Sequence, residues 1–237
     1  MDIDPKTKGL KIILNGNLYA ASGVGASAAS CVAIARALSN FFGKNLSDEI
    51  NDIAFEGEKG YHGTPSGIDN AASTFGGLIW FQKEESNTIE RLDIPSPVEV
   101  VLGNSGKVAD TSAAVSGVRE RKGRNPDRYQ QIFNRAENIA FLAKRALEDE
   151  DYVELGKLMN ENHKLLQQIE VSCRELDFMV EVALKNGALG AKLTGGGLGG
   201  NMIALTPGRD LQERVANALE KEGFQVVMTS IGVTRQG

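Results

Sequence analysis

Cysteine, aromatic residues and long apolar stretches are all scarce in this chain of 237 residues. Two cysteines, Cys31 and Cys173, stand far apart, which argues against a disulfide framework and favours a reduced, cytoplasmic compartment. No apolar run approaches the roughly 20 residues of a membrane-spanning helix, so no membrane partner is expected. The formal net charge is −5 and no basic cluster is interleaved with aromatics, which argues against a general nucleic-acid binder.

The remaining composition is that of a globular protein, long enough for one large domain or two smaller ones. Residues 1–5 carry neither the basic nor the apolar region expected of a signal peptide. Pro95 and Pro97 interrupt the chain before a new apolar run begins. We therefore expect a first domain over residues 1–94 and a second over residues 95–237.

The first half of the chain predicts a short strand followed by helices. Residues 10–14 form an apolar run typical of a strand. Residues 27–42 carry apolar side chains at helical spacing. A second helix, with Ser47 as its N-cap, is expected to extend to about residue 59. Residues 77–81 predict a further strand, which a charged turn follows.

The second half combines long helices with a few strands. Residues 126–186 predict three helices, with breaks near Asp151 and Val171. Residues 191–194 and 202–205 predict strands on either side of a glycine-rich segment. Helices set against a small sheet make this half α+β. A helix over residues 210–222 and a strand over residues 224–233 complete the prediction.

Two glycine-bearing segments, residues 22–29 and 194–200, indicate the chemistry. Glycine lets the backbone come close to a bulky anion, and a helix N-terminus adds unpaired N–H groups and a positive partial charge. Between them in the sequence lies Asp69, which follows a Pro-Ser-Gly turn and precedes a run of small residues. A carboxylate combined with anion-binding segments suggests a phosphoryl-transfer enzyme.

Several alternatives compete for the first glycine segment. Gly23, Gly25 and Ala28 fit a dinucleotide-binding fingerprint, but that motif requires a second strand after the helix, and another helix follows here. An ordinary P-loop also fails, because no Gly-Lys-Ser/Thr follows. A plain glycine turn that opens a helix stays open for this segment by itself. Ser27 has two roles open, as a helix cap or as a Mg²⁺ ligand.

Other polar residues have ordinary interpretations. Residues 195–200 contain five glycines in six positions between two strands, where a two-residue turn would suffice. This excess of glycine suggests that the backbone comes close to another group. His62 and His163 share no metal-ligand spacing, and we expect His163 to be a surface or partly buried helix histidine. A basic group between residues 119 and 124 is more often a solvated face than an anion site; its members are Arg119, Arg121, Lys122 and Arg124.

Taken in this order, the segments resemble the GHMP kinase superfamily. Residues 22–29 are similar to its second motif, the phosphate loop, and residues 192–200 to its third motif, which supports the nucleotide phosphates and the active-site floor. Residues 56–70, above all the stretch Thr-Pro-Ser-Gly-Ile-Asp-Asn, are similar to the mevalonate kinases within that superfamily. Residues 104–119 resemble the segment that begins their second domain. The resemblance covers nearly the whole chain.

The resemblance implies a two-domain α+β fold, in which an incomplete ribosomal-protein-S5-like domain precedes a ferredoxin-like domain. It implies ATP-dependent phosphorylation of mevalonate in isoprenoid precursor synthesis, with ATP and Mg²⁺ as cofactors, and it leaves a homodimer open. The family's first motif, which carries a lysine well before the phosphate loop, does not occur in this sequence. Another small-alcohol kinase and an inactive nucleotide-binding homologue therefore stay open as alternatives.

The resemblance also implies residue roles. Asp69 matches the catalytic base, and Ser27 and Glu58 match the Mg²⁺ ligands. Ala26 stands where the family usually has the first of two serines, and Ser27 keeps the second. Nucleotide contacts are implied for Ser22, Gly23, Val24, Gly25, Ala26, Ser27, Ala28, Gly195, Gly196 and Gly197, and substrate contacts for His62, Thr64, Asp69 and Thr111.

Overall fold

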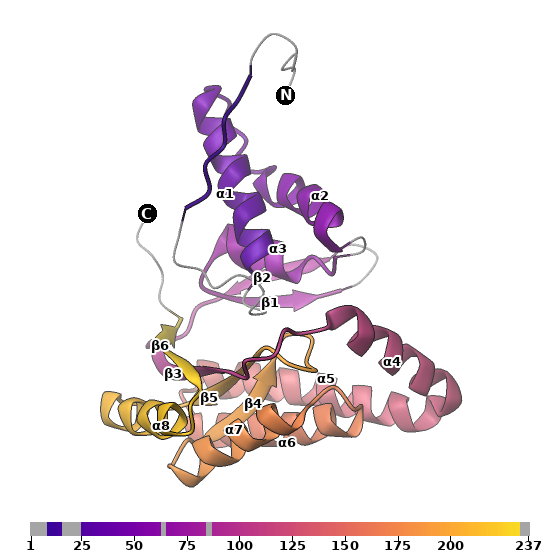
Figure 1. The fold of residues 1–237 in the computed structure, drawn as a ribbon, viewed down its shortest axis with the longest axis vertical. Helices are drawn as coiled ribbons and strands as arrows, with labels where there is room; N and C mark the ends of the chain where they lie inside the picture. The colour runs from indigo at the N-terminus through magenta and orange to yellow at the C-terminus, as the bar shows by residue number, and fades with distance from the viewer. Residues whose placement is uncertain (1–8, 16–24, 63–64, 84–86, 233–237) are drawn as a thin grey trace. The chain divides into compact units, whose positions relative to one another are not determined.

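The computed structural model describes residues 9–15, 25–62, 65–83 and 87–232 (Figure 1). The chain forms two compact units that divide between Thr74 and Phe75. A division into family domains near residue 94 stays a prediction. Within the described ranges, no helix combines the length and the apolar character needed to cross a membrane.

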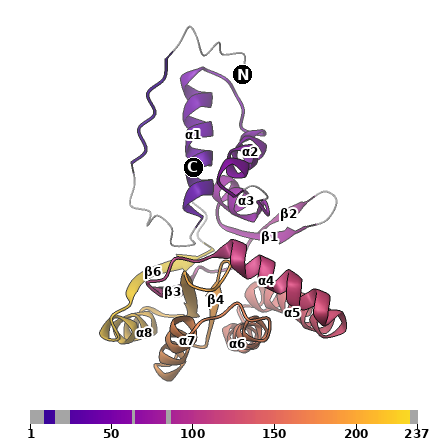
Figure 2. The same ribbon diagram turned by 45° about the vertical axis from the view of Figure 1, so that its right-hand side comes forward.

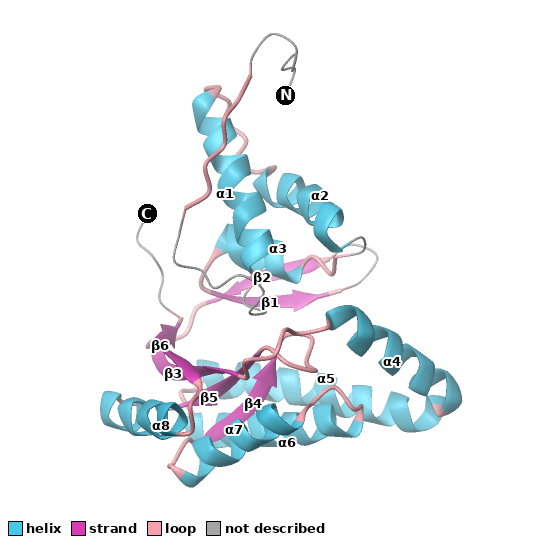
Figure 3. Cartoon of the chain, viewed as in Figure 1, coloured by secondary structure: helices cyan, strands magenta, loops and turns pink. Residues whose placement is uncertain are grey.

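The first unit is built from helices, and its described part contains no other regular structure (Figure 3). Helices α1 and α2 pack through small and branched side chains: Val32 and Ala35 meet Ile50 and Ala54. The two helices approach closely at one point, where a Cβ added to Gly57 would lie 2.8 Å from the Cys31 sulfur. The helices are α1 (Ala26–Phe41), α2 (Ile50–His62) and α3 (Ile68–Phe75).

Two predictions for this half are wrong. Residues 10–14 form no strand and are exposed, because no other strand in the described part of the chain pairs with them and an isolated strand is unstable in water. Ser47 is not the N-cap of α2, which begins three residues later at Ile50. The Ser47 hydroxyl instead donates to the Asn45 side chain at 2.7 Å, a local contact that competes with capping.

The second unit contains a β-hairpin, a four-stranded sheet and five helices gathered around that sheet in its described part (Figure 2). The sheet has the order β4-β5-β3-β6, and every pairing in it is antiparallel. The elements are β1 (Leu78–Gln82), β2 (Thr88–Leu92), β3 (Val98–Asn104), α4 (Thr111–Arg124), α5 (Pro126–Glu148), α6 (Tyr152–Gln168), α7 (Arg174–Lys185), β4 (Gly190–Thr194), β5 (Asn201–Leu205), α8 (Arg209–Lys221) and β6 (Gln225–Ile231).

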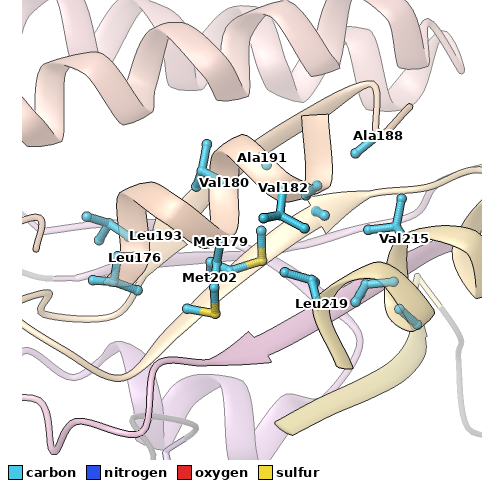
Figure 4. Packing of buried hydrophobic residues seen from close by; sticks show 14 of the residues in the cluster. Leu176, Met179, Val180, Val182, Ala188, Ala191, Leu193, Met202, Val215 and Leu219 are labelled. Atoms are coloured by element: carbon cyan, nitrogen blue, oxygen red, sulfur yellow. The ribbon is translucent and has the colours of Figure 1, made fainter. Parts of the chain in front are cut away.

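The core of this unit lies on both faces of the sheet. Successive side chains of a strand point to opposite faces, so Val100 joins the cluster with α5 and α6 while Val101 joins the cluster with α7 and α8. Figure 4 shows Met179 of α7 and Leu219 of α8 packed toward Met202 of the sheet. Both clusters meet at β3, so this strand fixes the helices of the two faces relative to each other.

The three long helices appear where the pattern predicted them. Helix α6 begins after Asp151, whose carboxylate accepts a hydrogen bond from the Glu154 amide at 2.9 Å and so caps the helix. The second break falls between α6 and α7 and includes Val171, as predicted. Helix α4 and strand β2 were not predicted.

Candidate active site

Helix α1 begins without a side-chain cap. Its N-cap residue is Gly25, with φ 69° and ψ 26°, and glycine has no side chain that could accept a hydrogen bond from the first turn. The N–H groups of a first helical turn have no partner within the helix, so these amides face outward with the positive end of the helix dipole. Ser27 is the second residue of the helix, so it does not act as the cap.

Asp69 lies beside this helix N-terminus. It stands in the first turn of α3, and a Cβ added to Gly25 would be 3.8 Å from the Asp69 Cβ and 3.9 Å from its Oδ1. The next residue, Asn70, is buried and donates from Nδ2 to the Asn51 side chain at 2.8 Å. This contact fixes the start of α3 against α2, and it holds the exposed Asp69 carboxylate next to the N-terminus of α1.

Glu58 is a buried carboxylate on α2, with 2% of its surface exposed. Burial raises the pKa of the Cys31 thiol on α1, and the charge of the nearby Glu58 raises it further. Ser27 lies one turn before Cys31, and residues four apart share one face of a helix. Ser27 and Cys31, the residue that Glu58 approaches, therefore lie on the same face of α1.

These two side chains suit a magnesium ion. In the described part of the chain, no group of three or more acidic, histidine or cysteine side chains is arranged around one point. Mg²⁺ does not require such a group, because it prefers oxygen ligands and usually takes one or two from the protein, with the others coming from phosphates and water. The Ser27 hydroxyl and the Glu58 carboxylate are oxygen ligands of the kind that meets this requirement.

The glycine loop between β4 and β5 packs against its own chain. The Leu198 amide donates to the Val171 carbonyl at 2.8 Å, and the Gly200 amide donates to the Lys107 carbonyl at 2.9 Å. A Cβ added to Gly197, which has φ 81°, would lie 2.1 Å from the Val171 oxygen. The close approach that the excess of glycine predicted is thus, at this position, an approach to the neighbouring backbone.

The loop also meets one predicted substrate residue. A Cβ added to Gly196 would lie 2.6 Å from the Thr111 hydroxyl oxygen, so the two residues are adjacent. Thr111 is the first residue of α4, whose N-cap, Asp110, accepts a hydrogen bond from the Ala113 amide at 2.8 Å. A capped helix therefore fixes Thr111 against the glycine loop.

The basic residues of α4 are mostly engaged in structural contacts. Arg121 donates to the Ile169 carbonyl at 2.8 Å and ties α4 to the segment after α6. The Lys122 ammonium lies 5.1 Å from the Phe133 ring centre. Arg124 pairs with a glutamate one turn earlier on its own helix. These contacts favour the interpretation that the basic group is not an anion site.

His163 is more buried than expected, with 5% of its surface exposed. Its Nδ1 accepts a hydrogen bond from the Leu193 amide at 3.3 Å, and its Nε2 lies 3.1 Å from Asp177 Oδ1. Three residues earlier on α6, Asn160 Oδ1 accepts from the Ala191 amide at 2.9 Å. Because β4 is an edge strand, α6 takes the place of a neighbouring strand along it.

A sequence signal for this arrangement exists in hindsight. Gly156, Asn160 and His163 stand at a spacing of four and three, which places them on one face of α6. A Cβ added to Gly156 would lie 2.3 Å from the Leu189 carbonyl oxygen, and one added to Gly190 would lie 2.3 Å from the Gly156 oxygen. Only a helix with glycine at this point can come close enough for its side chains to reach the strand.

Four predicted site residues lie outside the described residues, and so does one side chain. His62 is the last residue of α2, and its side chain belongs to this undescribed part. The four residues are Ser22, Gly23, Val24 and Thr64. Their assignments stay predictions.

Comparison with known proteins decides the family. Residues 2–77 match the family model for the GHMP kinases N terminal domain, and residues 143–225 match the one for GHMP kinases C terminal. A mevalonate kinase of Pyrococcus horikoshii is 34% identical over 238 residues, which cover 98% of this chain and 69% of that relative. The chain belongs to the GHMP kinase family.

Further relatives agree with this membership. A mevalonate kinase of Arabidopsis thaliana is 34% identical over 241 residues, covering 93% of this GHMP kinase chain and 63% of its own length. The crystal structure of L. major mevalonate kinase in complex with R-mevalonate superposes with a TM-score of 0.82 at 36% identity, covering 89% of this chain and 67% of that one. The chain thus spans about two thirds of the length of these relatives. The predicted α+β GHMP kinase fold is confirmed.

Proposed function

We propose that this GHMP kinase chain transfers the terminal phosphoryl group of ATP to the primary hydroxyl of mevalonate. The similarity to the L. major mevalonate kinase, whose crystal structure contains R-mevalonate, is the observation that carries the proposal. The placement of Asp69 beside the N-terminus of α1 supports it from the chain's own geometry. Phosphoryl transfer depends chiefly on positioning and on stabilising charge, and both requirements have candidate residues here.

The N-terminus of α1 is proposed to bind the ATP phosphates. Its first-turn amides have no partners in the helix, and they combine with the helix dipole to attract an anion. Gly25 has a left-handed backbone and no side chain, so it leaves the approach to these amides open. The loop from Gly195 to Gly197, which lies against Thr111, is likewise proposed to contact the nucleotide.

Asp69 is proposed to accept the proton of the substrate hydroxyl. An exposed carboxylate beside a phosphate site can orient a hydroxyl through one hydrogen bond and can take its proton as the phosphoryl group arrives. Ser27 and Glu58 would hold Mg²⁺, which when bound would neutralise charge on the phosphate oxygens. Thr111, together with His62 and Thr64, is proposed to contact the substrate.

An ADP-release assay on the purified chain tests this function. Mevalonate, phosphomevalonate, galactose and homoserine are compared at equal concentration, and ADP formation is expected with mevalonate alone. ADP formation with another of these alcohols would assign the chain to a different branch of the family. ATP binding without ADP formation from any of them would support the inactive nucleotide-binding homologue.

The setting of the reaction is a further part of the proposal. Two cysteines far apart in the sequence support a reducing, cytoplasmic compartment. Size-exclusion chromatography with light scattering would distinguish a homodimer from a monomer, and fractionation of cells that express the tagged chain would test its location.

A further inference from the structure

Three side chains form a line of polar contacts beside the glycine loop. They are His163 on α6, Ser172 in the segment after α6, and Asp177 on α7. The Ser172 hydroxyl donates to Asp177 Oδ1 at 2.5 Å, and the same oxygen lies 3.1 Å from His163 Nε2. A single carboxylate oxygen therefore connects the histidine and the serine.

The two ends of this line lie next to residues that adjoin the glycine loop. At one end, His163 Nδ1 accepts from the amide of Leu193, the residue before Thr194 at the end of β4. At the other end, Ser172 directly follows Val171, whose carbonyl accepts from the Leu198 amide in the middle of the loop. One end of the line thus holds the strand that leads into the loop, and the other end lies one residue from the backbone contact at the centre of the loop.

The state of the His163 imidazole matters to this arrangement. Nδ1 can accept from Leu193 only when it carries no proton, so the neutral ring has its proton on Nε2, facing Asp177. Burial lowers the pKa of His163 and favours this neutral form; Lys192 of β4 acts in the same direction and Asp177 of α7 opposes it. A second proton on the ring would have to displace the Leu193 hydrogen bond.

We propose that His163, Asp177 and Ser172 are positioning residues that set the conformation of the glycine loop, and that protonation of His163 releases this loop. The proposed function has this loop support the nucleotide phosphates, and the following consequence rests on that function. The protonation state of the His163 imidazole then controls the apparent affinity of the enzyme for ATP. None of the three side chains is proposed to touch the reacting atoms.

The first test does not depend on catalysis. The amide signals of Leu193 and Leu198 are followed by NMR between about pH 5 and 8 in the full chain, together with the imidazole signal that disappears in His163→Gln. Glutamine can accept and donate as the neutral ring does, but it does not titrate in this range. In the wild type both amides are expected to shift with the imidazole, and in His163→Gln they are expected to stay still. An imidazole that titrates while the Leu198 amide does not move overturns the proposal.

The second test separates positioning from stability. Ser172→Ala and Asp177→Ala are expected to raise the KM for ATP about tenfold, the effect of losing one ordinary hydrogen bond. Asp177→Asn keeps an oxygen at Oδ1 that can accept both contacts, so its KM is expected to stay close to that of the wild type. Matched controls are Ser116→Ala, whose hydroxyl donates to the Ser112 carbonyl of its own helix, and Asp210→Asn in the first turn of α8.

The outcomes are distinguishable from those of the proposed function. Lower melting temperatures for Ser172→Ala and Asp177→Ala, with an unchanged KM for ATP, would leave a purely structural network and overturn the inference. If the wild type releases no ADP with any alcohol, the proposed function fails, and the amide titration still decides whether His163 controls the loop.

Discussion

Replacing Gly197 by alanine tests the packing of the glycine loop most directly. The backbone there has φ 81°, a conformation that costs an L-residue about 1–2 kcal/mol. The new Cβ would also lie 2.1 Å from the Val171 carbonyl oxygen, whereas carbon and oxygen in contact stay about 3.3 Å apart. The loop must therefore move by about 1 Å and lose the Leu198–Val171 hydrogen bond, worth about 1 kcal/mol.

A second glycine separates strain from collision. Gly223 has φ 87°, almost the same as Gly197, but nothing lies within 4 Å of a Cβ added there. Gly223→Ala should therefore lower the free energy of unfolding by the strain alone, about 1–2 kcal/mol. Gly197→Ala should lower it by about 3 kcal/mol or more, because the lost hydrogen bond and the displaced backbone are added.

Urea unfolding measures both variants. Trp80 is the only tryptophan, and it packs at a ring-centre distance of 5.0 Å on Phe141 of the second unit, so its fluorescence reports the unfolding of that unit. Equal free energies of unfolding for the two variants, within about 0.5 kcal/mol, would refute the steric reasoning. If Gly223→Ala lowers the free energy of unfolding by about 1–2 kcal/mol and Gly197→Ala does not lower it, the glycine loop can rearrange to admit the new Cβ.

Three further perturbations follow from the first unit and from the buried histidine. Asp69→Asn should reduce kcat by several orders of magnitude and spare ATP binding, because it keeps the shape and removes the base; turnover near the wild-type level would exclude Asp69 as the base. Glu58→Gln and Ser27→Ala should each raise the Mg²⁺ concentration for half-maximal activity, more strongly for Glu58→Gln, which also removes a charge. Since Gly25 is the N-cap of α1, Ser27→Ala should change the melting temperature little, and a clear loss of stability with unaltered Mg²⁺ dependence would point to a structural serine. His163 has a lowered pKa in the folded state, so the unfolded chain takes up this proton first as the pH falls. The contribution of His163 to the free energy of unfolding is present above about pH 6.5 and is lost progressively below it. Urea unfolding at several pH values should show less of this loss in His163→Gln. An identical pH dependence of the two proteins would contradict the prediction.

Elements with a self-contained signal were predictable from the sequence. Helices α5, α6 and α7 are long and amphipathic, and Asp151 provides a cap at the break between the first two. Helix α4 was missed because its sequence mixes serine, glycine and charged residues without a clear apolar face, and its position is fixed instead by contacts such as the one from Arg121 to Ile169. Strand β2 has a charged sequence that becomes a strand through pairing with β1.

In the site, the features with a local sequence motif were predicted, and those that depend on contacts between distant segments were not. The local motifs indicated Asp69, the α1 N-terminus and the glycine loop, because glycine and turn residues announce unusual backbone. Residues 10–14 have strand composition but no strand partner among the described residues, so composition misled the prediction there. His163 and Asp177 stand 14 positions apart on different helices, and no spacing rule connects them before the fold is known.

The contact between α6 and β4 has a consequence for association between molecules. An edge strand with unpaired amides is a template on which a strand of another molecule can add, and this is a common route to aggregation. Here the amides of Ala191 and Leu193 are already taken by Asn160 and His163. A strand that arrives at the β4 edge meets the side of a helix instead of free hydrogen-bonding groups. The glycine pair that brings α6 so close to the sheet therefore also protects the folded protein against intermolecular sheet growth along β4.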